Sequence, residues 1–138
     1  MSTLNLHKTE MTANDGTPTR LIYDQEGDIL EIFFGKNESA TGVELTDQIV
    51  LRLNWQTRHA ISLMLLDFSI LTERTEYGPR SYPLDKLDDL PEDLRELALR
   101  LVTSMPVSQF LKLTHFQTPL MESVPLTYVE SQPIMAIA

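Results

Sequence analysis

The chain has 138 residues, a hydrophobic fraction of 42% and a formal net charge of −9, which suits one acidic globular domain with one ordinary core. It contains no cysteine, which excludes disulfides, thiol catalysis and cysteine-ligated metal sites. Its basic residues are scattered among acids, so direct binding to nucleic acid or to an anionic membrane is not expected.

Residues 1–19 are polar and aperiodic, and they include the turn formers Asn14, Asp15, Gly16 and Pro18. We expect them to form a flexible leader. The first residues lack the basic and then apolar layout of a secretion signal. No apolar run approaches the roughly 18 residues of a membrane-spanning helix. The expected compartment is therefore the cytoplasm.

Short apolar runs separated by turn formers fill residues 20–70, the pattern of a small antiparallel β-meander. Ile49, Leu51 and Leu53 alternate with polar residues and should share one buried face. The last run is apolar on both sides, so we expect it to be covered on both faces. The expected strands are residues 20–23, 29–34, 43–45, 49–53 and 60–66.

The turn between the first two of these runs holds three carboxylates, Asp24, Glu26 and Asp28, with Gly27 available for a positive φ. Carboxylates at alternate positions can hold a hard cation. The Ca²⁺-loop template places glycine after the third acid and glutamate at the twelfth position, whereas this loop has Gly27 before the third acid and Gly35 at the twelfth position. We interpret the segment as a hairpin turn without a metal. A small metal-dependent hydrolase that uses these carboxylates is the alternative.

Residues 71–138 are expected to form a helical extension followed by an apolar tail. Pro91 suits the first turn of a helix, and Glu92 and Asp93 complement its dipole. Apolar residues then recur at helical spacing until Pro106, which ends the helix near Thr103. A short helix over residues 107–111 is expected to follow. The apolar stripe comprises Leu94, Leu97, Ala98, Leu101 and Val102.

The segment 113–138 has Glu122 and Glu130 as its only charged residues and is rich in apolar side chains. Its prolines oppose helix formation and favour an extended path, which suits strand addition to an open sheet edge. We expect this tail to dock on another chain or on its own core. Trp55 at the tip of the last hairpin is a second candidate anchor. The predicted partner-binding residues are Trp55, Leu126, Tyr128, Val129 and Ile134.

The motif Tyr23-Asp24-x-Glu26-x-Asp28-x-Leu30-x-Ile32 resembles the opening hairpin of a family of small bacterial domains of unknown function. The later features of that family follow in order over about residues 20–70: Glu44, Ile49-Val50-Leu51, Ile61 to Leu65 and a closing Asp67-Phe68-Ser69. The family's Asp- and Gly-rich last turn is replaced here by Asn54 to His59. Some members resemble antitoxin-like partners of small toxins, which implies protein binding and no established activity.

No catalytic constellation is visible. His7, His59 and His115 are far apart in the sequence, and no nucleophile elbow or phosphate-binding loop is present. We therefore predict no cofactor and a non-enzymatic protein-binding or scaffolding module, either antitoxin-like or an assembly subunit, that forms a homo-oligomer. The predicted fold class is α+β, with a four- or five-stranded antiparallel meander packed against one or two C-terminal helices and an extended apolar tail.

Overall fold

A computed structural model describes residues 6–71, 74–75, 78–79, 82–83, 85–117 and 123–129, with side chains described for residues 6–70 and 86–111. Six strands form the main sheet: β1 (Leu6–Thr12), β2 (Pro18–Asp24), β3 (Ile29–Phe34), β4 (Thr41–Glu44), β5 (Ile49–Asn54) and β6 (His59–Leu66). The helical segments are α1 (Phe68–Leu71), η2 (Asp85–Asp89), α2 (Glu92–Val102) and η3 (Val107–Gln109). The shorter strands and the last hairpin are β7 (Arg74–Thr75), β8 (Gly78–Pro79), β9 (Tyr82–Pro83), β10 (Leu111–Gln117) and β11 (Ser123–Val129).

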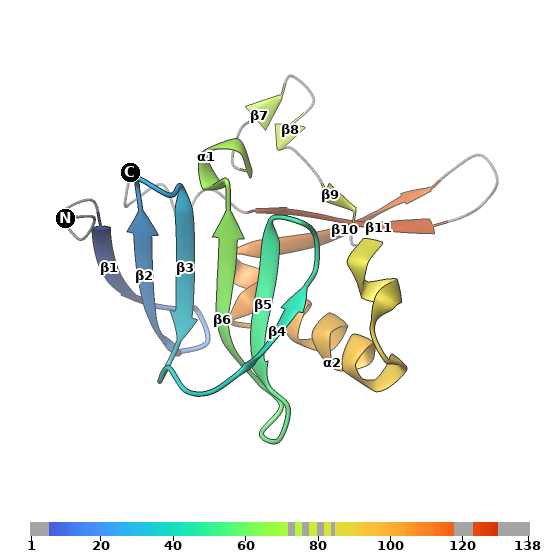
Figure 1. Ribbon diagram of the computed structural model, residues 1–138, viewed down its shortest axis with the longest axis horizontal. Coiled ribbons are helices and arrows are strands. Elements are labelled where there is room, and N and C mark those ends of the chain that lie inside the picture. Colours follow the sequence, from blue (N-terminus) through green and yellow to red (C-terminus); the bar gives the residue numbers. More distant parts are fainter. Residues whose placement is uncertain are drawn as a thin grey trace.

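The main sheet is antiparallel throughout and has the order β1-β2-β3-β6-β5-β4. It consists of two three-stranded meanders that meet where β3 pairs with β6 (Figure 1). The α+β fold class is confirmed. The prediction of four or five strands in one meander is wrong in number and in order. An extra strand at one edge gives six strands, and β3 pairs with β6 and not with β4, which lies at the other edge.

The extra strand is β1, which lies inside the segment predicted to be a flexible leader. It pairs with β2 along its whole length, from Leu6 opposite Asp24 to Thr12 opposite Pro18. Leu6, Thr9 and Met11 are half-buried, and Met11 packs against the core. The leader prediction is therefore wrong for Leu6–Thr12, because backbone pairing and a few partly buried side chains hold a mostly polar strand in the sheet.

The two meanders have the same turn in the same place. In the turn between β2 and β3, Asp24 Oδ1 accepts hydrogen bonds from the backbone N–H groups of Glu26 (3.1 Å) and Gly27 (3.2 Å). In the turn between β5 and β6, Asn54 Oδ1 accepts the equivalent bonds from Gln56 and Thr57 at 2.9 and 3.1 Å. Both are Asx turns.

The last residue of each turn adopts a left-handed backbone, Asp28 with φ of 56° and Arg58 with φ of 61°. The positive φ expected at Gly27 is thus found one residue later. Asp tolerates this region better than most residues because its short side chain can hydrogen-bond locally. Gly27 is instead constrained by space, because a Cβ there would lie 3.1 Å from Asp24 Oδ2.

One face of the main sheet packs against the helical segments and forms the core. The predicted helix is confirmed as α2, which begins after Pro91 and ends at the cap Thr103. Its residues Leu97, Ala98 and Val102 are buried against the sheet, and η3 supplies Val107. The fully buried large side chains on these elements and their neighbours are Leu21, Leu30, Ile32, Leu45, Ile49, Leu51, Leu53, Leu63, Leu65, Phe110 and Leu111.

The C-terminal segment contains a second, three-stranded sheet of order β10-β11-β9. Strands β10 and β11 pair from Leu111 opposite Val129 to Gln117 opposite Ser123. The backbone is thus extended in both strands, as the sequence predicted for part of the tail. Among the described residues, no helix is long and apolar enough to cross a membrane.

Candidate functional site

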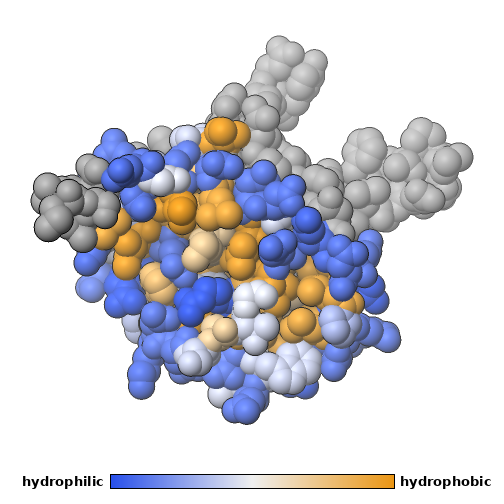
Figure 2. All heavy atoms as spheres, in the orientation of Figure 1, coloured by the Kyte–Doolittle hydropathy of each residue, from blue (hydrophilic) through white to orange (hydrophobic). Residues whose placement is uncertain are grey.

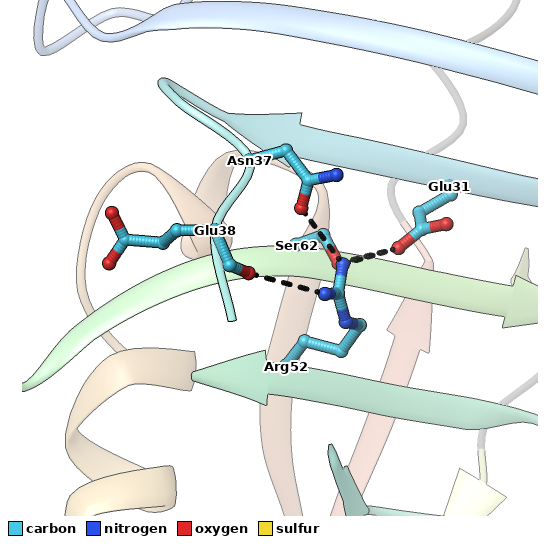
Figure 3. Close-up of polar contacts among 5 residues, drawn as sticks. All are labelled: Glu31, Asn37, Glu38, Arg52 and Ser62. Carbon is cyan, nitrogen blue, oxygen red and sulfur yellow. Dashed lines mark hydrogen bonds and ion pairs between the residues drawn. The ribbon is translucent and has the colours of Figure 1, made fainter. Parts of the chain in front are cut away.

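The other face of the main sheet, which we call the open face, carries a network of polar side chains around Arg52 (Figure 3). Arg52 on β5 reaches across β6 to Glu31 on β3, with its Nη1 atom 3.1 Å from Glu31 Oε2. The hydroxyl of Ser62 on β6 lies between them and donates a hydrogen bond of 2.7 Å to the same oxygen. Arg52 Nη1 also lies 3.1 Å from Ser62 Oγ. The three side chains therefore form one network across three strands.

The loop from β3 to β4 is tied to this network. Arg52 donates to Asn37 Oδ1 and to the backbone carbonyl of Glu38, both at 3.4 Å. Asn54 Nδ2 donates to the Glu38 carboxylate at 2.7 Å. These bonds hold the connection that carries the chain past β6 and β5 to the sheet edge (Figure 1). Arg52 and Glu31 keep 25% and 20% of their side chains exposed, so the network is partly shielded from water.

Apolar side chains surround the network. Because side chains alternate across a strand, the residues that share a face with Glu31 and Arg52 follow from the strand register. Phe33 is almost fully buried, and the Arg20 guanidinium lies 4.8 Å above its ring. In Figure 2 the apolar side chains form orange areas across the sheet, separated by blue polar ones. The half-buried apolar residues of the open face are Leu6, Ile22, Ile29, Val50, Met64 and Leu66.

The open face is nearly neutral. Its strand residues include three basic side chains and four acidic ones, which leaves a net charge of −1 on a chain of net charge −9. The acidic excess therefore lies elsewhere on the protein. These charged residues are Lys8, Arg20 and Arg52, and Glu10, Asp24, Glu31 and Glu44.

The turn carboxylates considered for a cation are engaged by protein donors. Asp24 caps its own turn, as described above. Asp28 accepts hydrogen bonds from the Tyr23 hydroxyl (2.8 Å) and from the N–H and hydroxyl of Ser69 (3.1 and 2.7 Å). Among the residues with described side chains, no group of three or more His, Asp or Glu side chains could hold a metal ion. In the stretch that resembles the bacterial domains, Asp28 of the opening turn is thus in contact with Ser69 of the closing Asp67-Phe68-Ser69.

Tyr23 and Asp28 perturb each other's titration. Partial burial by itself would raise the pKa of the Asp28 carboxyl, but the hydrogen bonds from Ser69 and Tyr23 together lower it below its ordinary value. Burial raises the pKa of the Tyr23 hydroxyl, and the hydrogen bond to Asp28 and the charges of Asp28 and Asp24 raise it further. Tyr23 also contacts the Phe68 ring, at a centroid distance of 5.5 Å.

Trp55 lies at the tip of the β5–β6 hairpin, as predicted, with 37% of its surface exposed. The Arg58 guanidinium lies 5.0 Å above its ring. Of the other predicted partner-binding residues, Leu126, Tyr128 and Val129 are on β11, where the structure describes the backbone alone. Ile134 lies outside the described residues. The side chains of these four residues lie outside the described part of the structure, so their grouping with Trp55 stays a prediction.

The two histidines with described side chains, His7 and His59, have no described contact with the network of Glu31, Arg52 and Ser62. His7 on β1 lies 3.2 Å from Gln25 Oε1 and stacks on Tyr23. His59 is exposed at the start of β6, and His115 is on β10, where side chains are not described. Sequence reasoning missed Arg52, Glu31 and Ser62 as a group. The available signal was a charged residue in the middle of each of two apolar strands, which suggests a pair across the sheet.

Comparison of the chain with protein-family models, with curated proteins and with solved structures found no match in any of the three.

Proposed function

We propose that this protein is a non-enzymatic protein-binding module that acts as an assembly subunit, and that its open face stacks on the open face of a second copy. The observation that supports this proposal is the apolar surface around Glu31, Arg52 and Ser62. In the part of the chain that the structure describes, the helical residues of the core cluster pack on the opposite face. The sequence pattern of β6 implies cover on both faces. A partner protein covers the open face, on which none of the described helical residues of the core packs.

The low charge of the open face favours a second copy as that partner. Two chains of net charge −9 repel each other unless they meet through surfaces that carry little of this charge. The open face has that property, and its paired Arg52 and Glu31 need no charged partner. A basic protein would bind more favourably to the acidic surfaces elsewhere. A two-fold axis between two such faces makes an isologous interface.

The open face is also large enough. Six strands spaced about 4.8 Å apart span about 24 Å, and strands of this length run for about 20 Å. Two stacked faces would thus bury roughly 1,000 Å², which is the size at which specific interfaces begin. The cytoplasm is the proposed compartment, in keeping with the cysteine-free composition.

The resemblance to small bacterial domains, with its antitoxin-like members, stays a prediction and agrees with a protein-binding role. No described contact favours the alternative, a metal-dependent hydrolase that uses the turn carboxylates. Asp24 and Asp28 instead have the contacts of residues that shape a turn.

Sedimentation velocity over a range of protein concentrations tests the proposal. Met64 lies opposite Glu31 in the sheet register. In the monomer a lysine at this position is therefore close to the Glu31 carboxylate, whereas in the stacked dimer it adds a cation to the interface. We expect the wild type to form dimers and Met64→Lys to dissociate at least about tenfold more readily, because an interfacial charge is costly to desolvate.

The matched control is Thr57→Lys, which makes the same change in charge at an exposed turn position and should leave the dimer intact. Circular dichroism checks that each variant folds. A wild type that stays monomeric, or a Met64→Lys variant that dimerises as the wild type does, would contradict the proposal.

A further inference from the structure

The sheet ends at β4, and the outer edge of this strand has unpaired backbone groups within the described part of the chain. The Leu45 N–H donates to the Ile49 carbonyl at 2.8 Å, so these two residues occupy the position of a hydrogen-bonded pair at the end of the ladder, although the Ile49 N–H donates to Thr46 Oγ1. In an antiparallel ladder such pairs alternate along the strand. The backbone N–H and C=O groups of Gly42 and Glu44 therefore point away from β5, where an added strand could bind them.

This edge is short and carries Glu44, but several other features by which proteins block strand addition are missing from it. The β4 sequence Thr41-Gly42-Val43-Glu44 contains no lysine, no proline and no register shift against β5. The opposite edge, β1, carries Lys8. Gly42 has space above it, because an added Cβ would meet the nearest side-chain atom, of Val50, at 3.8 Å. The β4 edge thus leaves room for an added strand at Gly42.

Two hollows adjoin this edge, and Thr41 and Trp55 line both of them. The hollow on the α2 side has a volume of about 250 Å³ and is almost entirely apolar. Trp55, Pro91 and Leu94 line it, with Asp93 at its border. Because Arg58 packs on the Trp55 ring, the indole is held in position as one wall of the hollow.

The charges around this surface are mainly acidic. Glu44 lies on β4 itself, and the exposed Glu92 and Asp93 begin α2 beside the hollow. The nearby Arg58 is already stacked on Trp55. An extended ligand along β4 would therefore be attracted if it carried lysine or arginine.

We propose that β4 and the hollow of Trp55, Pro91 and Leu94 form a peptide-binding site for an extended, basic and apolar segment of another protein. The segment adds to β4 as a seventh strand of the sheet, and its backbone pairs with Gly42 and Glu44. One apolar side chain enters the hollow, while its basic side chains lie near Glu44 and Asp93. The hollow lies on the α2 side of the sheet, so Glu44 is the one side chain that this site shares with the open face, and the site does not depend on the dimer.

The single tryptophan makes the site directly observable, because all tryptophan fluorescence of the protein comes from Trp55. Random nine-residue peptides displayed on phage are selected against the full-length protein, and the enriched sequences are synthesised. We expect alternating apolar and basic residues in these peptides. Their binding should saturate and should shift the Trp55 emission to shorter wavelength, since the indole loses contact with water.

Two variants with matched controls test the geometry. Gly42→Pro removes an outward N–H without removing a bond to β5, and it should weaken the selected peptides roughly tenfold. Asp93→Asn keeps the oxygen that accepts the Leu94 N–H at 3.0 Å but removes the charge, and it should weaken binding at low salt. Glu96→Gln makes the same change in charge farther along α2 and should have little effect. Thermal melts and circular dichroism verify folding.

The proposal is overturned if no peptide is enriched, or if the enriched peptides bind Gly42→Pro and Asp93→Asn as well as the wild type. It is also overturned if binding leaves the Trp55 emission unchanged. Met64→Lys should bind the peptides normally. Loss of the dimer and loss of peptide binding are therefore distinguishable results.

Discussion

Ser69 donates two hydrogen bonds to Asp28, from its hydroxyl to Oδ2 at 2.7 Å and from its backbone N–H to Oδ1 at 3.1 Å, across 41 residues of sequence. The Phe68 N–H adds a bond of 3.0 Å to the backbone carbonyl of Asp28. These bonds join the β2–β3 turn in the first meander to α1, which follows β6 of the second. Asp28, with its left-handed backbone, is held from both its main chain and its side chain.

Replacement of Ser69 by alanine should therefore destabilise the fold. The Ser69 hydroxyl is lost, while the backbone bond to Asp28 remains. Hydrogen bonds to a charged acceptor contribute more than neutral ones, and we expect the free energy of unfolding to fall by about 1–2 kcal/mol. Urea denaturation measures it. Ser39→Ala, at an exposed loop position, is the control and should change little. Equal stability of Ser69→Ala and wild type would show that the contact is energetically neutral.

The stability of the protein should depend on Asp28 in acid. Because the folded state lowers the pKa of this carboxyl, its contribution is present above the pKa of the unfolded chain. That contribution is lost as the pH falls through the lowered pKa of the folded state. Asp28→Asn should be less stable than wild type near neutral pH, and the difference should shrink in acid. Denaturant midpoints of the two proteins are measured along a pH series. A difference that does not change with pH would show that the ionisation of Asp28 does not contribute to stability.

Truncation of the chain before Ala13 should destabilise the fold substantially. The truncation removes β1, breaks its ladder with β2 and exposes Leu21 and Tyr23 at a new sheet edge. We expect the thermal midpoint to drop by about 3–4 °C for each kcal/mol lost, and several kcal/mol to be lost. Differential scanning calorimetry measures the change. An unchanged midpoint would favour the flexible leader that the sequence suggested.

Glu31 and Arg52 should be energetically coupled. A double-mutant cycle with Glu31→Gln and Arg52→Met should give a coupling of roughly 0.5–1.5 kcal/mol, since both side chains are mostly shielded yet still reach water. Arg52→Lys should not restore the wild-type stability, because an ammonium cannot reach Glu31, Ser62 and the loop with one rigid group. Additive effects of the two single substitutions would show that the two side chains lie close together without stabilising the fold through their contact.

Local patterns in the sequence determined the elements themselves. Alternating apolar residues such as Ile49, Leu51 and Leu53 predicted β5, and the spacing of Leu94 and Leu97 after Pro91 predicted α2. In each case a period of two or 3.6 residues places apolar side chains on one face, and that property depends only on near neighbours in the chain. The Asx turn at Asp24 is equally local.

Tertiary structure alone decided how these elements meet. Whether Leu6–Thr12 forms a strand depends on the free edge of β2, and the place of β4 depends on β3 pairing with β6. The network of Glu31, Arg52 and Ser62 exists because that pairing brings three strands together. Strand pairing is a contact between residues distant in sequence. Its register is selected by burial of the whole core, which no local period encodes.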